Sequence, residues 1–159
     1  MDFFSTTAGK AIITFLISIV PVIELRGGIP YAVSQGLDPW IAFAASVLGN
    51  MLPVPFILLF IRKILQWMKR YPRLGKIAIK LEERAQRKST KVKKSELIGL
   101  CILVAIPLPG TGAWTGALVA ALMEMRLKRA VPTIFLGVLI AGILVTLACT
   151  GVKALSFLV

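Results

Sequence analysis

The sequence contains no histidine and only two cysteines, Cys101 and Cys149. Each cysteine lies alone within an apolar run, without the spacing that zinc sites or disulfide frameworks require. We therefore expect no bound metal, no disulfide and no cofactor. Because the sequence shows no histidine-paired nucleophile and no pair of carboxylates, the pattern also argues against an enzyme.

Acidic residues are scarce as well, and the basic residues that outnumber them are unevenly placed. The 159 residues include 19 Lys and Arg against 7 Asp and Glu, and 13 of those 19 lie between Arg62 and Lys94. Hydrophobic residues make up 57% of the chain, which is more than a soluble domain of this size can bury. A basic loop between uncharged apolar stretches is typical of a cytoplasmic loop in a membrane protein, so we expect no nucleic-acid partner.

Four apolar blocks follow one another along the chain. Residues 39–61 and 130–152 each contain 23 residues without a charge, which is long enough to cross the core of a bilayer at about 1.5 Å per residue. These two blocks predict transmembrane helices. The other two, residues 11–37 and 97–123, are interrupted near their middles by residues that do not continue a helix.

The interruptions divide these two blocks into short halves. The first contains Glu24–Pro30 (ELRGGIP) and the second contains Pro107–Gly112 (PLPGTG). Proline removes a backbone donor, glycine permits a sharp reversal, and each half is too short to span a bilayer. We therefore predict two re-entrant helical hairpins. Their tips should meet near the middle of the membrane, because backbone groups at that depth need protein partners.

The charge pattern gives this arrangement a topology. If the basic connector is cytoplasmic, both termini and the first hairpin lie outside, and the second hairpin enters from the cytoplasm. The chain then divides into residues 1–61, the first hairpin plus a transmembrane helix; residues 62–96, the connector; and residues 97–159, the second hairpin plus a transmembrane helix. The predicted fold class is an all-α integral protein of the plasma membrane with an inverted repeat. An offset of 88 positions, which places Gly28 on Gly116, gives the repeat limited direct support.

The connector has the pattern of a basic amphipathic helix. Leu74, Ile77, Ala78 and Leu81 recur at helical spacing among basic residues. Such a helix would lie on the inner leaflet and attract anionic lipids, at about 1 kcal/mol for each cation near the surface. A solvated helix that packs on a protein partner is the alternative.

Glu24 and Arg26 are the only charged residues between positions 11 and 37. Charges inside a membrane cost a few kcal/mol, so they need partners and often mark a transport pathway. Arg26, together with half-helices whose N-terminal ends point towards the middle of the membrane, predicts a site for a phosphate or carboxylate group. Glu24 is better suited to carry a proton, because desolvation lets a carboxyl group alternate between its charged and neutral forms. The alternative is a structural pair that pins the hairpin.

The remaining candidate residues surround the two interruptions. Pro30 is expected in the first turn of the returning half-helix, and Thr111 or Thr115 is expected to cap the corresponding half-helix of the second hairpin. Trp114 is either a wall of the substrate site or a packing residue, and Asn50 is either a polar group beside the cavity or a helix-packing residue. Five small or helix-breaking residues complete the candidate substrate or ion site: Gly27, Gly28, Pro109, Gly110 and Gly112.

Both interrupted segments resemble known sequence motifs. Residues 24–30 (ELRGGIP) and 107–116 (PLPGTGAWTG) are similar to the two signature segments of the small multidrug export protein family of bacteria and archaea. The resemblance covers nearly the whole chain and implies a membrane exporter. The plan of broken helices also resembles the DedA superfamily, whose members carry acidic and arginine residues in facing hairpins and are implicated in moving polyprenyl-phosphate lipids. Unlike that pattern, the second hairpin here has no arginine.

These features favour a proton-coupled transporter that moves a small amphipathic or anionic-headgroup substrate through a site where the hairpins meet. A polyprenyl-phosphate lipid translocase is the first alternative, and a non-transporting membrane scaffold that acts through the basic connector is the second. The expected partners are the bilayer, anionic lipids at the connector and the transported substrate. Two spans and two hairpins make a thin bundle, so we also expect a homodimer.

Overall fold

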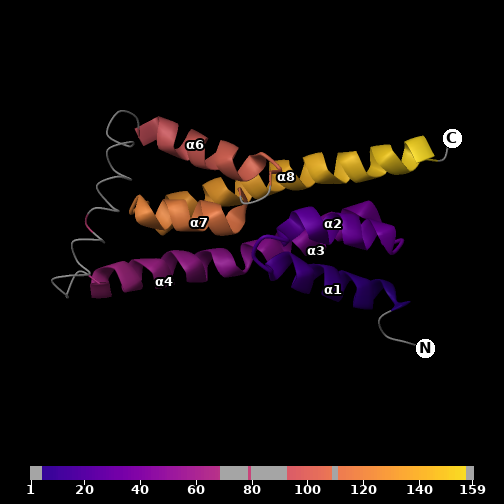
Figure 1. The fold of residues 1–159 in the computed structure, drawn as a ribbon, viewed down its shortest axis with the longest axis horizontal. Coiled ribbons are helices and arrows are strands. Elements are labelled where there is room, and N and C mark those ends of the chain that lie inside the picture. The colour runs from indigo at the N-terminus through magenta and orange to yellow at the C-terminus, as the bar shows by residue number, and fades with distance from the viewer. Residues whose placement is uncertain (1–4, 69–78, 80–92, 109–110, 157–159) are drawn as a thin grey trace.

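The computed structural model describes residues 5–68, 79, 93–108 and 111–156. Within these residues every regular element is a helix, which confirms the predicted all-α class. In chain order the helices are α1 (Thr7–Ile19), α2 (Glu24–Ser34), α3 (Pro39–Met51), α4 (Pro53–Met68), α6 (Lys93–Ala105), α7 (Ala113–Leu122) and α8 (Leu127–Ser156) (Figure 1).

Two helical stretches are long and apolar enough to cross a membrane. α3 and α4 together supply the stretch Pro39–Ile64, and α8 supplies Leu127–Val152, each with 26 residues. At about 1.5 Å per residue, each stretch is about 39 Å long. Both predicted transmembrane segments are thus confirmed as long apolar helices. α3 and α4 are separated at Leu52, because Pro53 lacks the backbone N–H that would continue the helix.

The shorter helices form two pairs that open towards opposite ends of the molecule. α1 runs to the centre of the long axis and α2 returns from it, whereas α6 and α7 do the same from the other end (Figure 1). α1 begins and α8 ends at one end of the molecule, which we call the terminal end. α4 ends and α6 begins at the opposite end, the connector end. Two turns that are far apart in sequence therefore both lie near the centre.

The helix pairs pack on the long helices in matching ways. α1 and α2 both contact α3, and α6 and α7 both contact α8. Each returning helix also contacts the long helix of the other half, so that α2 packs on α8 and α7 packs on α4. α3 and α8 contact each other as well, and this joins the two halves.

The turns that follow the two returning helices have the same local structure. Gly36 after α2 has a φ of 75° and Glu124 after α7 has a φ of 52°. In both turns the next residue donates a 3.0 Å hydrogen bond back into the helix, from the amide of Leu37 to the carbonyl of Ala32 and from that of Met125 to the carbonyl of Ala120. The paired positions lie 88 residues apart, as do the first residues of α3 and α8.

Glycines allow the helices of each half to approach closely. A Cβ at Gly28 would overlap the hydroxyl of Ser18 on α1, and a Cβ at Gly116 would collide with Val104 on α6. Gly49 on α3 and Gly137 on α8 repeat this relation, because each faces a backbone carbonyl of the shorter helix packed against it. Gly28 and Gly116 are separated by 88 positions, as are Gly49 and Gly137.

The first interruption lies earlier in the chain than its sequence predicts. α1 ends at Ile19 and α2 already begins at Glu24, so the chain reverses over residues 20–23 rather than over Glu24–Pro30. Val22 in this turn has a φ of 77° and is 76% exposed, a backbone conformation that is costly for a β-branched residue.

Gly27, Gly28 and Pro30 consequently lie inside α2, and the prediction that Pro30 occupies its first turn is wrong. Gly27 and Gly28 serve close packing rather than reversal, since a Cβ on either would collide with a neighbouring side chain. Pro30 is tolerated because it lies on the exposed side of a short helix, where only one backbone hydrogen bond is lost.

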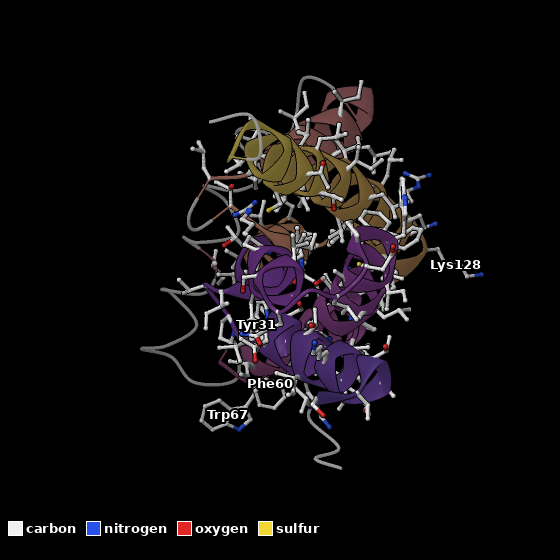
Figure 2. The ribbon with its side chains drawn as sticks, turned by 90° about the vertical axis from the view of Figure 1, so that its right-hand side faces the viewer. Tyr31, Phe60, Trp67 and Lys128 are labelled. Atoms are coloured by element: carbon white, nitrogen blue, oxygen red, sulfur yellow. The ribbon has the colours of Figure 1, made fainter. Side chains whose placement is uncertain are left out.

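Large apolar side chains cover the outside of the bundle. Phe60 is 65% exposed, and many further Leu, Ile, Val, Phe and Trp side chains on α1, α3, α4, α6 and α8 are also exposed. Figure 2 shows Phe60 and Trp67 pointing away from the bundle on one side and Lys128 pointing away on the other. A soluble protein rarely exposes so continuous an apolar surface, so this surface fits apolar surroundings.

Candidate functional site

The start of α2 lies against the start of α7, although the two are about 90 residues apart in sequence. Glu24, the first residue of α2, is only 4% exposed. Its Oε1 accepts a 3.3 Å hydrogen bond from the amide of Trp114, and the amide of Ala113 also interacts with the carboxylate. These are the first two amides of α7, and the residue before them is Gly112, which has no side chain to cap them. Glu24 therefore caps α7 from the other helix pair.

This arrangement corrects the predicted capping of α7. The hydroxyl of Thr111 lies 2.8 Å from the carbonyl oxygen of Ile106 and 2.9 Å from that of Leu108, so it binds the turn that follows α6. Thr115 lies inside the first turn of α7 rather than before it. A carboxylate binds the positive end of a helix more strongly than a hydroxyl, and Gly112 leaves the space that the Glu24 carboxylate occupies.

Arg26 makes the complementary contacts with the end of α6 and the turn that follows it. Its Nη2 donates to the carbonyl oxygen of Ile106 at 2.8 Å and to the hydroxyl of Thr111 at 3.2 Å. The guanidinium also donates to the carbonyl oxygens of Leu108 and Thr111, and at 3.5 Å to that of Val104. Carbonyl groups at the C-terminal end of a helix lack intrahelical donors and carry partial negative charge. Arg26 thus satisfies the end of α6.

The charges of the first helix pair therefore match the helix ends of the second. The carboxylate of Glu24 lies at the positive end of α7, and the guanidinium of Arg26 lies at the negative end of α6. The two side chains also attract each other. Both are tied to backbone groups of the other helix pair, so they hold the two turns together.

Trp114 supplies a bond in the opposite direction. Its indole Nε1 donates a 3.0 Å hydrogen bond to the carbonyl oxygen of Ile19, the last residue of α1. A side chain in the first turn of α2 therefore donates to the end of α6, and a side chain in the first turn of α7 donates to the end of α1. This cross-bonding accounts for how two unwound segments satisfy their backbone groups in an apolar bundle.

Asn50 lies on α3 and is only 1% exposed. Neither its Oδ1 nor its Nδ2 has a hydrogen-bond partner among the described residues, and the same holds for Oε2 of Glu24. Buried polar groups normally have partners, so each unpartnered group requires a reason. Asn50 is therefore a candidate for contact with a ligand, an ion or water.

Two predicted site residues, Pro109 and Gly110, lie outside the described residues, as does the predicted amphipathic helix of the connector apart from residue 79. Sequence reasoning also missed Thr14, Ser18 and Ser46, which are buried polar residues near Gly28. The sequence pattern that could have identified them is a pair of polar residues four positions apart in an apolar helix, which places Thr14 and Ser18 on one face of α1.

An apolar groove of about 480 Å³ begins at Trp114 and follows α4. Among the described residues that line it, Lys63 is the one that carries a charge, and it lies on the part of α4 nearer the connector end. The other lining residues are Pro53, Phe56, Ile57, Leu59 and Phe60. The groove thus extends from Trp114, beside the junction of the two turns, to a cation.

Two apolar spans, an apolar exterior and charged residues at the centre define a helical membrane protein. Residues 24–144 match the family model described as "Putative small multi-drug export protein", and the chain belongs to this family. The matched range begins at Glu24, directly after the first turn, and includes the second turn, Arg26 and Trp114. The family description denotes an export protein, that is, a transporter. No curated protein and no solved structure matches the chain.

Proposed function

We propose that this protein is a proton-coupled transporter whose substrate site is the junction of the two turns. The observation that supports this most is the carboxylate of Glu24 at the N-terminal end of α7, because such helix ends bind anions. An anionic substrate group would compete with the carboxylate for the same amides. Protonation of Glu24 removes its charge and frees these amides, so that binding of the proton and binding of the anion favour each other.

In this proposal α1–α2 and α6–α7 are re-entrant hairpins, and the two halves form an inverted repeat in the plasma membrane of a bacterium or archaeon. The opposite directions of the helix pairs support this arrangement, as do the matching turns and glycines at a spacing of 88 residues. The connector is assigned to the cytoplasm because basic residues concentrate there, and both termini are assigned to the outside. Glu24 and Arg26 then lie near the middle of the membrane.

The groove beside Trp114 supports an amphipathic substrate. Its apolar wall suits a hydrocarbon chain that extends from an anionic group at the junction, and Lys63 adds a cation towards the connector end of the groove. This favours a small amphipathic anion, and it keeps a polyprenyl-phosphate lipid as the alternative substrate. Both substrates place an anionic group in reach of protein cations and a hydrocarbon tail in the groove.

The test is transport into proteoliposomes that contain a pH-sensitive dye. A panel of amphipathic anions, amphipathic cations and a short-chain polyprenyl phosphate is added to wild-type protein and to Glu24→Gln. We expect at least one anion to produce proton flux with the wild type and none with Glu24→Gln, which preserves volume but carries no exchangeable acid proton. Glu124→Gln is the matched control, because Glu124 lies exposed in the turn after α7. Equal flux in Glu24→Gln and wild type would refute proton coupling through Glu24.

A further inference from the structure

A row of buried polar side chains leads from Glu24 towards the terminal end of the molecule. It consists of Thr14 and Ser18 on α1 and of Ser46 and Asn50 on α3, and we call these four residues the polar stripe. All four are almost completely buried. Each pair has a spacing of four residues, so its two members lie one turn apart on one face of their helix.

Gly28 of α2 brings the two halves of the polar stripe together. A Cβ at this position would overlap the hydroxyl of Ser18 and would lie 3.0 Å from the hydroxyl of Ser46. α2 and α3 run in opposite directions and pack on each other (Figure 1). One turn nearer the centre, Glu24 on α2 and Asn50 on α3 are therefore at the same level. The inner end of the polar stripe thus lies at the level of the proposed proton carrier.

The hydrogen bonding of these residues is incomplete within the described part of the chain. Oγ of Ser46, both polar atoms of the Asn50 side chain and Oε2 of Glu24 have no partner there. The hydroxyls of Thr14 and Ser18 donate to carbonyl oxygens of their own helix, at 2.7 and 2.8 Å, and their oxygens remain available as acceptors. The groups that need partners include both donors and acceptors, and water satisfies both kinds.

The related positions on α8 are apolar. The turn after α2 and the turn after α7 are related by a spacing of 88 residues. At the same spacing, Ser46 corresponds to Ile134 and Asn50 to Val138. The contacts confirm this relation locally, because Gly28 faces Ser46 and the corresponding Gly116 faces Ile134. Ile134 and Val138 are fully buried. Packing at these two levels therefore does not require polar side chains.

The same contrast holds between α1 and α6. Gly49 faces Ser18 of α1, and the corresponding Gly137 faces Val104 of α6. Equivalent positions on α1 and α6 are therefore 86 residues apart. At that spacing Thr14 corresponds to Leu100, which is buried like Val104. The second half of the molecule is thus apolar at all four positions where the first half is polar.

We infer that the polar stripe is a hydrated proton path between the terminal end of the molecule and Glu24. The inference rests on the proposed role of Glu24 as the proton carrier. A proton enters from hydronium at the terminal end, passes along hydrogen-bonded water, and joins Oε2 of Glu24, which changes from carboxylate to carboxylic acid. Lys10 marks the outer end, one turn before Thr14, where its ammonium donates a 2.7 Å hydrogen bond to the carbonyl oxygen of Gln35. From Lys10 to Ser18 the path follows about 12 Å of helix.

The apolar positions of the second half make this path one-sided. Glu24 exchanges protons with the terminal end in the conformation described here, and not with the connector end. The charged groups near the path are few: Arg26 beside Glu24, Lys10 on α1 and Asp38, which caps α3 at the terminal end. α3 itself and α7 carry no charged residue. α8, which also contacts α2, carries its charges near its ends, at Lys128, Arg129 and Lys153. Transport then requires a second conformation that opens Glu24 to the connector end.

Silver-ion access to single cysteines tests the path without measuring transport. Ser18→Cys and Ser46→Cys are made in a chain that lacks Cys101 and Cys149, and Val104→Cys and Ile134→Cys are the matched controls at the related positions. Ag⁺ is added to intact cells or to inverted membrane vesicles, and the remaining thiol is labelled with a fluorescent maleimide after denaturation. Exposed Ser5→Cys reports in parallel which side of the membrane the start of α1 faces.

We expect Ser18→Cys and Ser46→Cys to react from the same side as Ser5→Cys. Their rates should exceed those of both controls by at least tenfold, which corresponds to about 1.4 kcal/mol. Equal rates in the polar and apolar halves, or reaction of Ser46→Cys only from the side opposite to Ser5→Cys, would overturn the proton path. A dry polar stripe would leave the proposed transport function standing. Reactive thiols combined with normal flux in Glu24→Gln would instead refute the proposed role of Glu24, and the polar stripe would then be hydrated without being a proton path to Glu24.

Discussion

The substitution Gly112→Ala should destabilise the protein through Glu24. Gly112 has φ and ψ of −122° and −157°, which alanine adopts without strain, so the backbone itself would tolerate the change. A Cβ at this position would, however, overlap the carboxyl group of Glu24. The carboxylate must then leave the first amides of α7. Losing a hydrogen bond to a charged group costs about 1.5–3 kcal/mol, whereas replacing glycine by alanine normally gains about 0.4–1 kcal/mol, so we expect a net loss of about 1–2 kcal/mol.

Equilibrium unfolding in mixed micelles, followed by tryptophan fluorescence, measures this loss. Gly99→Ala is the matched control, since Gly99 lies in α6 with nothing within 4 Å of a Cβ built there, and it should gain about 0.5–1 kcal/mol. In the background Glu24→Ala the colliding atoms are absent, so Gly112→Ala should then cost little. Two results would refute the packing of Glu24 against Gly112: an unchanged unfolding free energy in Gly112→Ala, or a loss in the double variant equal to the sum of the losses in Glu24→Ala and Gly112→Ala.

Three further outcomes follow from the same contacts. Arg26→Lys should lose about 2–4 kcal/mol of unfolding free energy, because one ammonium does not reach all the carbonyl oxygens that the guanidinium binds, whereas exposed Arg126→Lys should change little. Trp114→Phe should lose about 0.5–1.5 kcal/mol, because a phenyl ring remains aromatic but cannot donate the hydrogen bond to the end of α1. An unchanged unfolding curve would contradict that bond. Impermeant maleimide added to intact cells should label a cysteine at Ser5 but not one at Ser89, and the reverse pattern would invert the proposed topology.

The long helices were predictable because their signal is strong and local. Residues 39–61 and 130–152 carry no charge, and the structure contains long apolar helices over both. That the two other blocks are interrupted was also predictable, although the Gly27, Gly28 and Pro30 cluster that indicated it in the first block lies inside α2. The residue at which a helix begins was less predictable. α2 begins at Glu24 because the reversal occurs at residues 20–23, where a valine rather than a glycine adopts the positive φ.

The partners of the site residues depend on the tertiary fold. The sequence singled out Glu24 and Arg26 as buried charges, but their partners are backbone groups about 80 to 90 residues further along the chain. A cap supplied by a different helix pair leaves no local pattern, so the sequence pointed to Thr111 or Thr115 as the cap of α7. Gly112 carried a signal in retrospect, because a helix whose preceding residue has no side chain needs an external acceptor.

The polar stripe shows a related limit. Ser46 and Asn50 lie four residues apart in an apolar helix, a pattern that also occurs where helices simply pack. What distinguishes them is the comparison with Ile134 and Val138, which requires the correct spacing between the two halves. The sequence offset of 88 was visible from a few identities, and contacts between particular glycines and their neighbours gave it structural meaning.

The most direct test of the central claim, that the two turns form one site, is a disulfide between Glu24→Cys and Gly112→Cys in native membranes. The variant for this test has Cys101 and Cys149 replaced and a protease site inserted in the connector. After cleavage, a disulfide within one chain holds the two halves together on a non-reducing gel. Because a Cβ at Gly112 would overlap the carboxyl group of Glu24, the two sulfurs come within bonding reach. We expect nearly complete linkage on mild oxidation and none for the control pair of Glu24→Cys with Gly99→Cys. If the two halves of the folded, membrane-embedded Glu24→Cys, Gly112→Cys protein separate, the claim that the two turns form one site is contradicted.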